Sequence, residues 1–304
     1  MTSRAAGREP RSSVQPVTQA VTERSRRTTL GTADGVRIDA SYEPGPHGTD
    51  GPVIVVAHGF TGDLERPHVR RAAEVFGLRT AVVTFTFRGH GRSSGHSTVG
   101  DREVLDLAAA VAWARLLGHA RVVTVGFSMG GSVVLRHGAL HRPEPDGVHE
   151  GCTGEEGRTQ AWADAVVAVS APARWYYRGT APMRRLHWLI TRPVGRVVGR
   201  HVMRTRIHHR DWDPVPLSPV EAVPRIAPTP LLIVHGDRDP YFPVDHPRML
   251  AAAGGQDTEL WLEPGMGHAE HAADDALLAR IADWAVGRAA AGGGSPAGRS
   301  EGPG

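Results

Sequence analysis

The feature that most constrains the fold is a series of short, uninterrupted apolar runs that alternate with helix-like segments. Val53–Ala57 and Leu231–Val234 are two such runs, and both are rich in branched aliphatic residues. A strand that is apolar at every position is buried on both faces, which is typical of a parallel sheet covered by helices on each side. The sequence therefore predicts an α/β fold with a mostly parallel, doubly wound sheet.

The other expected elements follow the same alternation. Thr29–Thr32 and Val36–Ser41 flank an Asp-Gly turn signal, which predicts an antiparallel hairpin before the parallel strands. We expect Asp101 to cap a helix that carries Leu107 and Val111 on one face. Further strands are expected at Ala81–Phe87, Val122–Val125, Ala165–Val169 and Glu259–Leu262, and further helices at Gly130–Leu140 and Asp274–Arg288.

One long segment interrupts the alternation and suggests how the chain is divided. Residues 171–228 separate two expected strands by far more than an ordinary connection. Because this segment holds Trp175, Tyr176, Tyr177, Trp188 and Trp212, we expect a folded helical cap rather than a loose loop. The α/β core would then comprise residues 29–170 and 229–290, with a disordered arm over 1–28 and a flexible tail over 291–304.

Composition excludes several other classes of protein. The chain has 304 residues, of which 40% are apolar. This is enough to form a hydrophobic core, so we do not expect the whole chain to be disordered. The longest apolar runs fall far short of the ~20 residues that span a bilayer, and no apolar segment follows the basic N-terminus as a secretory signal would. A single cysteine, Cys152, cannot form an internal disulfide. We therefore expect a cytoplasmic protein.

The positive charge is unevenly distributed. The chain contains no lysine, and residues 171–228 hold eleven arginines against Asp211, Asp213 and Glu221. Nucleic-acid binding would require these arginines on a groove with groups that read or stack on bases, and we expect none. Peripheral attachment to a membrane through the basic, aromatic cap is an alternative that we do not favour.

The strongest chemical signal is the pentapeptide Gly126-Phe127-Ser128-Met129-Gly130, which lies between an expected strand and an expected helix. This is a G-x-S-x-G pattern in the strand–turn–helix context that a nucleophile elbow requires. Ser128 would project its hydroxyl from a strained turn, while Gly126 and Gly130 stand where Cβ atoms would collide with the tight turn and its neighbours. The helix that starts there would place its N-terminal amides near a reacting carbonyl.

Four further loops, each at the end of an expected strand, make the sequence resemble the α/β-hydrolase family over roughly residues 30–288. They are His58-Gly59-Phe60, Arg88-Gly89-His90-Gly91-Arg92-Ser93, His235-Gly236-Asp237-Arg238-Asp239-Pro240 and Gly265-Met266-Gly267-His268. The order Ser, Asp, His along the chain is the order found in that family. One departure is the absence of an aspartate just before the Arg88 stretch, where the chain has Thr84, Phe85, Thr86 and Phe87.

The resemblance implies a catalytic triad of Ser128, Asp239 and His268. His268 would accept the serine proton and return it to the leaving group, and an acidic residue would orient the imidazole. His271 is a rival for the base and Asp237 for the acid; we favour His268 at the end of the Gly-rich loop and Asp239 by the family's usual placement. We expect Asp237 to tie the loop to backbone amides instead.

The remaining site predictions concern the oxyanion and the substrate. The backbone N–H groups of Phe60 and Met129 are the expected oxyanion donors. His58 and His90 are expected to be structural. In the cap, Trp175 and Tyr176 are candidates for apolar contact with substrate, and Arg184 and Arg185 for contact with an anionic group; a solvated helix face is the competing interpretation of these arginines.

The expected reaction is hydrolysis of a small-molecule carboxylic ester or thioester through an acyl-enzyme. Acyl transfer, amide or lactone hydrolysis on the same triad, and a non-catalytic small-molecule binder are the alternatives. We expect no cofactor and no metal, because the sequence lacks H-E-x-x-H, Walker A and C-x-x-C patterns and the adjacent pair His208 and His209 is interpreted as a surface pair. The oligomeric state is not predicted.

Overall fold

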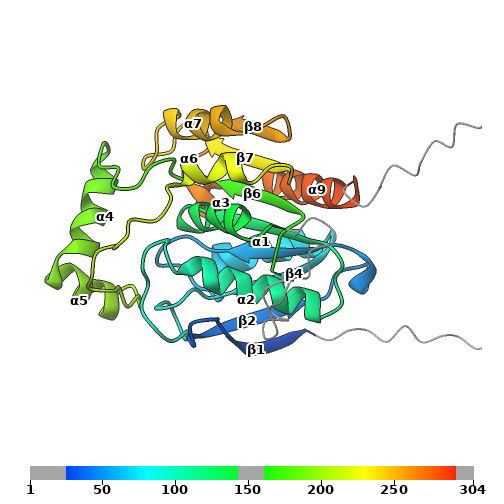
Figure 1. The fold of residues 1–304 in the computed structure, drawn as a ribbon, viewed down its shortest axis with the longest axis horizontal. Helices are drawn as coiled ribbons and strands as arrows, with labels where there is room; N and C mark the ends of the chain where they lie inside the picture. The colour runs from blue at the N-terminus through cyan, green and yellow to red at the C-terminus, as the bar shows by residue number, and fades with distance from the viewer. Residues whose placement is uncertain (1–24, 143–160, 292–304) are drawn as a thin grey trace, which may run out of the picture.

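The computed structural model describes residues 25–142 and 161–291, which contain an eight-stranded sheet flanked by helices (Figure 1). The strand order is β1-β2-β4-β3-β5-β6-β7-β8. Strands β3 to β8 pair in parallel, whereas β2 is antiparallel to both β1 and β4. The strands are β1 (Arg26–Gly31), β2 (Arg37–Glu43), β3 (Val53–Ala57), β4 (Ala81–Phe85), β5 (Val122–Phe127), β6 (Ala165–Val169), β7 (Leu231–Gly236) and β8 (Thr258–Glu263). This confirms the predicted α/β class and its N-terminal hairpin.

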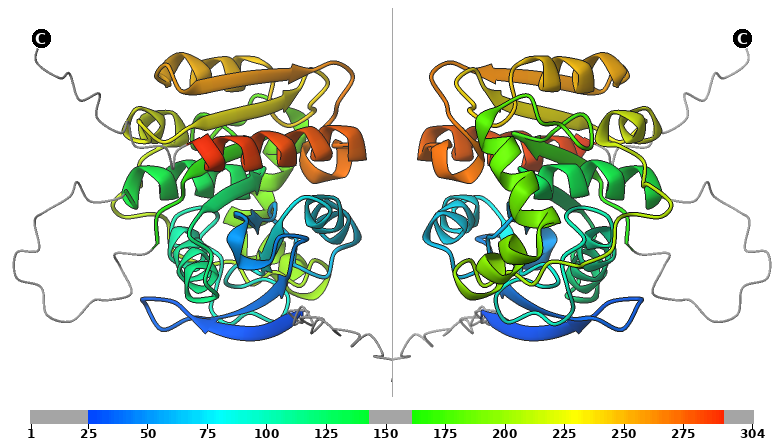
Figure 2. Two further views of the ribbon diagram at one scale, coloured as in Figure 1. Left: turned by 90° about the vertical axis from the view of Figure 1, so that its right-hand side faces the viewer. Right: turned by 90° about the vertical axis from the view of Figure 1, so that its left-hand side faces the viewer.

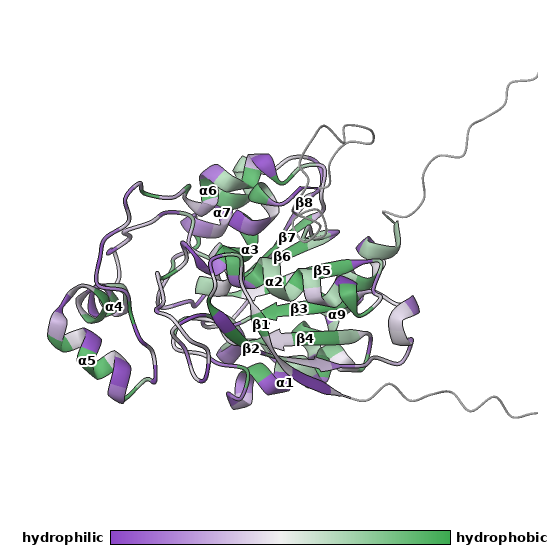
Figure 3. Cartoon of the chain, turned by 60° about the horizontal axis from the view of Figure 1, so that its bottom comes forward, coloured by the Kyte–Doolittle hydropathy of each residue, from purple (hydrophilic) through white to green (hydrophobic). Residues whose placement is uncertain are grey.

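The central strands are buried on both faces, as their apolar sequences require. Every residue of β3 through β7 is buried, and Figure 3 shows their hydrophobic colouring. In β3, Val53 and Val55 contribute to one apolar cluster and Ile54 and Val56 to the other, because alternate side chains point to opposite faces. Strand β8, at the edge, is only half-buried.

Two sets of helices cover the sheet. On one face, α2 (Glu103–Leu116), α3 (Met129–Leu140) and α7 (Asp245–Ala253) supply buried side chains such as Leu107 and Leu135. On the other face, α1 (Pro67–Gly77) and α9 (Asp275–Ala291) supply Phe76 and Ile281. The short helix α8 (Ala269–Ala272) precedes α9 at the carboxyl end of the strands.

Residues 171–228, called the insertion below, connect β6 to β7 and contain two well-formed helices. These are α4 (Ala181–Thr191) and α5 (Pro193–His201), followed by the short turns α6 (Pro219–Ala222) and η2 (Val223–Arg225). Figure 2 shows α4 and α5 in front of the strand ends in the right-hand view. The helix break between them falls at Arg192, whose extended backbone fits a residue that precedes proline. The predicted helical insertion is therefore present.

Several boundaries differ from the predictions for local reasons. Strand β4 ends at Phe85, two residues earlier than predicted, and the Phe87 N–H beyond it donates to the His58 imidazole. The cap of α2 is Arg102, not Asp101, whose carboxylate accepts from Arg136. Helices α1 and α7 were not predicted. The 1–28 arm (up to residue 24), the 291–304 tail (from residue 292) and Cys152 lie outside the described residues.

Candidate active site

Ser128 occupies a sharp turn between β5 and α3. Its φ of 53° and ψ of −112° lie in a region that non-glycine residues rarely adopt, and its N–H donates to the Val169 carbonyl at 2.8 Å. A Cβ on Gly126 would lie 2.2 Å from the Gly130 carbonyl oxygen, and one on Gly130 would lie 2.1 Å from the Ala57 carbonyl oxygen. Only glycine fits at both positions, so backbone packing accounts for the spacing of the motif.

Three side chains from three loops are joined by hydrogen bonds. The Ser128 Oγ lies 2.8 Å from His268 Nε2, and His268 Nδ1 lies 2.7 Å from Asp239 Oδ2. Each loop follows a strand end: Ser128 follows β5, Asp239 follows β7 and His268 follows β8. The structure thus brings together the residues predicted as nucleophile, base and acid.

The Asp239 carboxylate is buried but well supplied with donors. Its Oδ1 accepts from the N–H groups of Tyr241 at 2.8 Å and Phe242 at 3.1 Å. Burial by itself raises the pKa of Asp239, but the hydrogen bond and charge of His268, together with these amides, outweigh it and hold the pKa below the usual value. An ionised carboxylate at this position fixes the imidazole so that Nε2 faces Ser128.

The two rival residues lie elsewhere. Asp237 Oδ1 accepts from the Gly265 N–H at 2.7 Å. This bond joins the loop after β7 to the loop after β8, which carries His268. His271 is exposed on α8, and its ring contacts that of His68 with the centroids 3.7 Å apart. Neither residue joins the Ser128–His268–Asp239 chain.

The loop after β3 is held by a buried histidine. His58 Nε2 accepts from the Phe87 N–H at 3.0 Å, so His58 Nδ1 carries the proton and donates to the Gly59 carbonyl at 2.7 Å. That carbonyl also accepts from the Gly62 N–H. In a trans peptide the next N–H points the opposite way, so fixing the Gly59 carbonyl also fixes the N–H of Phe60. Met129 begins α3, where N–H groups have no partner within the helix.

The motif after β4 is held by ion pairs rather than by a preceding aspartate. The Arg88 guanidinium donates to Asp106 and Asp34, and the Arg88 side chain is 3% exposed. His90 is fully buried, with Nδ1 2.9 Å from the Arg88 carbonyl oxygen. His58 and His90 therefore occupy structural positions next to the site, and neither is bonded to Ser128.

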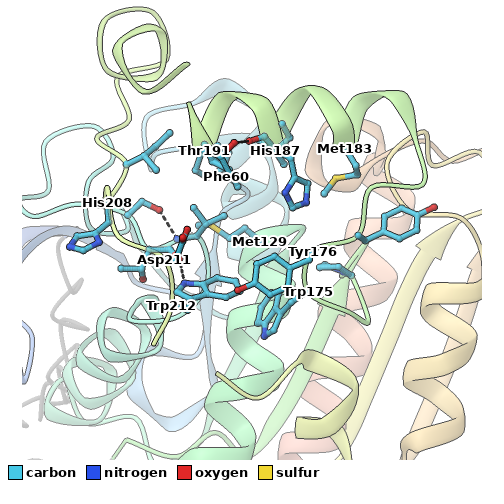
Figure 4. A pocket seen from close by; sticks show the side chains of 18 of the residues that line it. Phe60, Met129, Trp175, Tyr176, Met183, His187, Thr191, His208, Asp211 and Trp212 are labelled. Carbon is cyan, nitrogen blue, oxygen red and sulfur yellow. Dashed lines mark hydrogen bonds between the residues drawn. The ribbon is translucent and has the colours of Figure 1, made fainter. Parts of the chain in front are cut away.

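A cavity of about 710 Å³ opens beside Ser128. Its core side includes Phe60 and Met129, and its far side consists of residues of the insertion, among them Trp175 and Tyr176. Figure 4 shows the wall that the insertion contributes, with side chains of α4 across from Phe60 and Met129. The cavity thus lies between the sheet's strand ends and the insertion.

The predicted substrate residues divide into two groups. Trp175 and Tyr176 line the cavity, where both pack near Trp212 with ring centroids 5.0 and 5.5 Å away. Arg184 and Arg185 do not line it, because they lie on the exposed face of α4 while Met183 and His187 occupy its inner face. Their position fits the competing interpretation of a solvated helix face; the arginines that do line the cavity are Arg174, Arg178, Arg196 and Arg210.

Some residues that shape the site were not predicted. Ser170 Oγ accepts from the Ala269 N–H at 3.0 Å and so anchors the chain just after His268. Glu270 accepts from the Gly59 N–H at 3.2 Å, in the loop after β3. The amides of Tyr241 and Phe242 directly follow Asp239-Pro240, which is a local signal that the sequence did contain; Ser170 and Glu270 depend on contacts between distant segments.

Comparison with known proteins agrees with this fold. The model of the alpha/beta hydrolase family matches residues 54–281, so the chain belongs to the alpha/beta hydrolase family. A monoacylglycerol lipase from Mycolicibacterium smegmatis is 27% identical over 234 residues, which cover 71% of this chain and 80% of that protein.

Solved structures show the same architecture. An esterase from Pyrococcus furiosus superposes with a TM-score of 0.61 at 22% identity, covering 90% of this chain and 97% of the esterase. An alpha/beta hydrolase from a Penicillium species gives a TM-score of 0.64 at 17% identity, covering 88% of this chain and 100% of that one. Within the described ranges, no helix is long and apolar enough to cross a bilayer.

Proposed function

We propose that this chain is a serine hydrolase that cleaves carboxylic esters through an acyl-enzyme. The observation that carries the proposal is the unbroken series of hydrogen bonds from Ser128 Oγ through His268 to Asp239. A serine hydroxyl is a poor nucleophile unless a base lies within hydrogen-bond reach, and here the base and its orienting carboxylate are both in place. The curated relative named a monoacylglycerol lipase supports an ester as the substrate.

The first half of the reaction forms the acyl-enzyme. Ser128 Oγ attacks the ester carbonyl carbon while His268 Nε2 takes the hydroxyl proton, giving a tetrahedral intermediate. His268 then delivers that proton to the departing alkoxide, and the C–O bond to the alcohol breaks. In the second half, water loses its proton to His268 and attacks the acyl carbon, and Ser128 leaves with that proton.

The negative charge that develops on the carbonyl oxygen needs two donors. We assign these to the backbone N–H groups of Phe60 and Met129, which belong to cavity-lining residues on either side of Ser128 in the core. The His58 bond to the Gly59 carbonyl supports one donor, and the N-terminus of α3 supplies the other together with its favourable dipole. Preorganised donors of this kind contribute about 3 kcal/mol each to catalysis.

The cavity supports a substrate with an apolar acyl or alcohol group. Aromatic residues Trp175, Tyr176 and Trp212 and the thioether of Met183 provide apolar surface opposite Ser128. A volume of about 710 Å³ lies within the usual range for small-molecule sites, roughly 300–1,000 Å³. Thioesters, and transfer of the acyl group to a second alcohol instead of water, use the same intermediate and are separated by analysis of products.

A labelling experiment tests the mechanism. A fluorophosphonate probe should react with the wild-type protein and fail to react with Ser128→Ala, whereas the matched variant Ser41→Ala, on strand β2, should label normally. A series of nitrophenyl esters from acetate to dodecanoate, each assayed for kcat/KM, then tests the substrate class. Labelling that persists in Ser128→Ala would refute the assigned nucleophile, and a preference for acetate would refute the apolar acyl group.

A further inference from the structure

Glu270 is a buried carboxylate with one oxygen that accepts no hydrogen bond from the described residues. The residue is 2% exposed, and its Oε1 accepts only the Gly59 N–H at 3.2 Å among the contacts of the described residues. Its Oε2 is buried and accepts no hydrogen bond from the described part of the chain. The nearby Arg71 donates to the Glu270 carbonyl instead of to its carboxylate. A buried carboxylate normally has a cation or several hydrogen-bond donors beside it. A bound cation would therefore stabilise the Glu270 carboxylate.

Two imidazoles lie beside this carboxylate. His68, in the first turn of α1, places Nε2 3.9 Å from Glu270 Oε1 and has a side chain 21% exposed. His271, exposed on α8, lies against His68 with the ring centroids 3.7 Å apart. One ligand atom from each of His68, Glu270 and His271 can be chosen so that all lie within 4.8 Å of one another.

We propose that His68, Glu270 and His271 form a binding site for a divalent transition-metal ion of the zinc type. Two imidazole nitrogens and a carboxylate oxygen are ligands that such ions prefer, at about 2.0–2.2 Å. The exposed His271 can rotate to close the remaining distance, and the exposed side of the cluster leaves room for water as a fourth ligand. The ion would supply the positive charge that the buried carboxylate lacks.

The position of the cluster, between two segments that are far apart in sequence, gives the proposed ion a role in stabilising the fold. It would join α1 to α8, two segments about two hundred residues apart in sequence, and would restrict the unfolded chain by closing that loop. Glu270 also holds the Gly59 N–H and comes two residues after His268, so the ion would steady both the oxyanion loop and the histidine loop. None of the three ligands is bonded to Ser128 among the described contacts, and the proposal does not depend on the ester hydrolase activity.

Metal binding can be measured directly on untagged protein stripped with EDTA and dialysed. Titration with ZnCl₂ in a calorimeter should give one site per chain, and thermal unfolding with excess Zn²⁺ should occur several degrees higher than without it. Co²⁺ should give the visible absorption of a four-coordinate site. His68→Ala and His271→Ala should each weaken Zn²⁺ binding at least tenfold and abolish the thermal shift.

A second adjacent histidine pair provides the control. His208 and His209 stack with ring centroids 5.0 Å apart, and among the described residues they belong to no group of three possible metal ligands. His209→Ala should therefore bind Zn²⁺ as the wild-type protein does. The proposal is overturned if no stoichiometric binding occurs, or if binding survives in both His68→Ala and His271→Ala. Circular dichroism of the exposed-site variant His271→Ala verifies that it is folded.

Discussion

The two walls of the cavity differ in how firmly their side chains are held in place. On the core wall, Ser128 is hydrogen-bonded to His268 and through it to Asp239, and the neighbouring Gly126 and Gly130 pack directly against backbone. On the insertion wall, aromatic rings and arginines come from a segment whose helices expose large apolar side chains. Val194 is 65% exposed, Val202 73% and Trp188 52%.

This difference separates reaction chemistry from substrate selection. A change on the core wall alters atoms whose positions are determined by the sheet, so it should affect kcat or the fold itself. A change on the insertion wall alters side chains with fewer fixed contacts, so it should affect which esters bind.

Removing the nucleophile should have the largest effect. In Ser128→Ala, kcat for a nitrophenyl ester should fall by about 10⁵-fold or more, as in other serine hydrolytic triads. The thermal midpoint should change little, because alanine keeps the same Cβ and backbone conformation and loses only the hydrogen bond to His268. Steady-state kinetics and thermal unfolding of the same preparation provide both numbers, and a residual kcat within tenfold of wild type would contradict the core assignment.

Adding one methyl group at the elbow should damage the fold. In Gly130→Ala the new Cβ meets the Ala57 carbonyl oxygen at 2.1 Å, and backbone atoms of β3 and α3 must separate. We expect a loss of about 3 kcal/mol in the free energy of unfolding, at the upper end for overpacking.

Gly287→Ala is the matched control for this substitution. Gly287 is an exposed helical glycine in α9, and a Cβ there meets nothing within 4 Å. Alanine should stabilise that helix by about 0.5–1 kcal/mol. Urea unfolding of both variants should give opposite signs; equal effects would show that the packing at the elbow is not the cause.

Acid should destabilise the core that carries Ser128 through its buried histidines. Burial lowers the pKa of His58 to about 3 and that of His246 to about 4. The folded state then binds fewer protons than the unfolded state, so stability is retained above the ordinary histidine pKa of about 6.5 and decreases as the pH falls below it. His58 alone should account for about 3 kcal/mol between pH 6.5 and pH 4.

The measurement is the free energy of unfolding in urea at several pH values between 7.5 and 4.5. A His58→Asn variant, which keeps a polar side chain but does not titrate, should start less stable and show a shallower decrease. A stability that stays level down to pH 5 in the wild type would mean that these histidines do not remain neutral in the folded protein.

The sequence predicted the core wall far better than the insertion wall. Ser128, Asp239 and His268 could be located because each follows a strand within a short pattern, and strand ends of a parallel sheet converge at one edge. Glycine spacing added information because tight backbone packing restricts residue choice. Ser170 and Glu270 act through contacts between segments that are far apart in sequence. Such contacts produce no local sequence pattern, so these two residues could not be predicted.

The insertion shows the opposite case. Aromatic content correctly indicated a folded segment, and Trp175 and Tyr176 do line the cavity. The orientation of α4 could not be predicted, because Met183 and His187 mark one face as internal only once the helix register is known. Arg184 and Arg185 lie on the exposed face of α4, which is the solvated helix face given as the competing interpretation.

The smallest expected effect tests the arginines that do line the cavity. Replacing Arg178 and Arg196 together with Ala should raise KM for an ester that carries a carboxylate by about tenfold, which corresponds to about 1.4 kcal/mol. KM for a neutral ester of the same size and kcat for both should change little. The one side-chain hydrogen bond that either arginine makes within the described residues is the exposed bond from Arg196 to the Thr191 carbonyl at 3.0 Å, so the loss of stability should be small.

The double variant Arg184→Ala and Arg185→Ala is the matched comparison, since it removes the same charge from the same segment outside the cavity. If the effect depends on direct contact, this pair should leave KM for the anionic ester within about twofold of wild type, and added salt should weaken any remainder. Equal increases in KM for both pairs would show that the insertion acts through its overall positive field. In that case the insertion wall would attract anionic substrates by long-range electrostatics without positioning them. The two walls would then differ in the distance over which they act on the substrate, not in which of them contacts it.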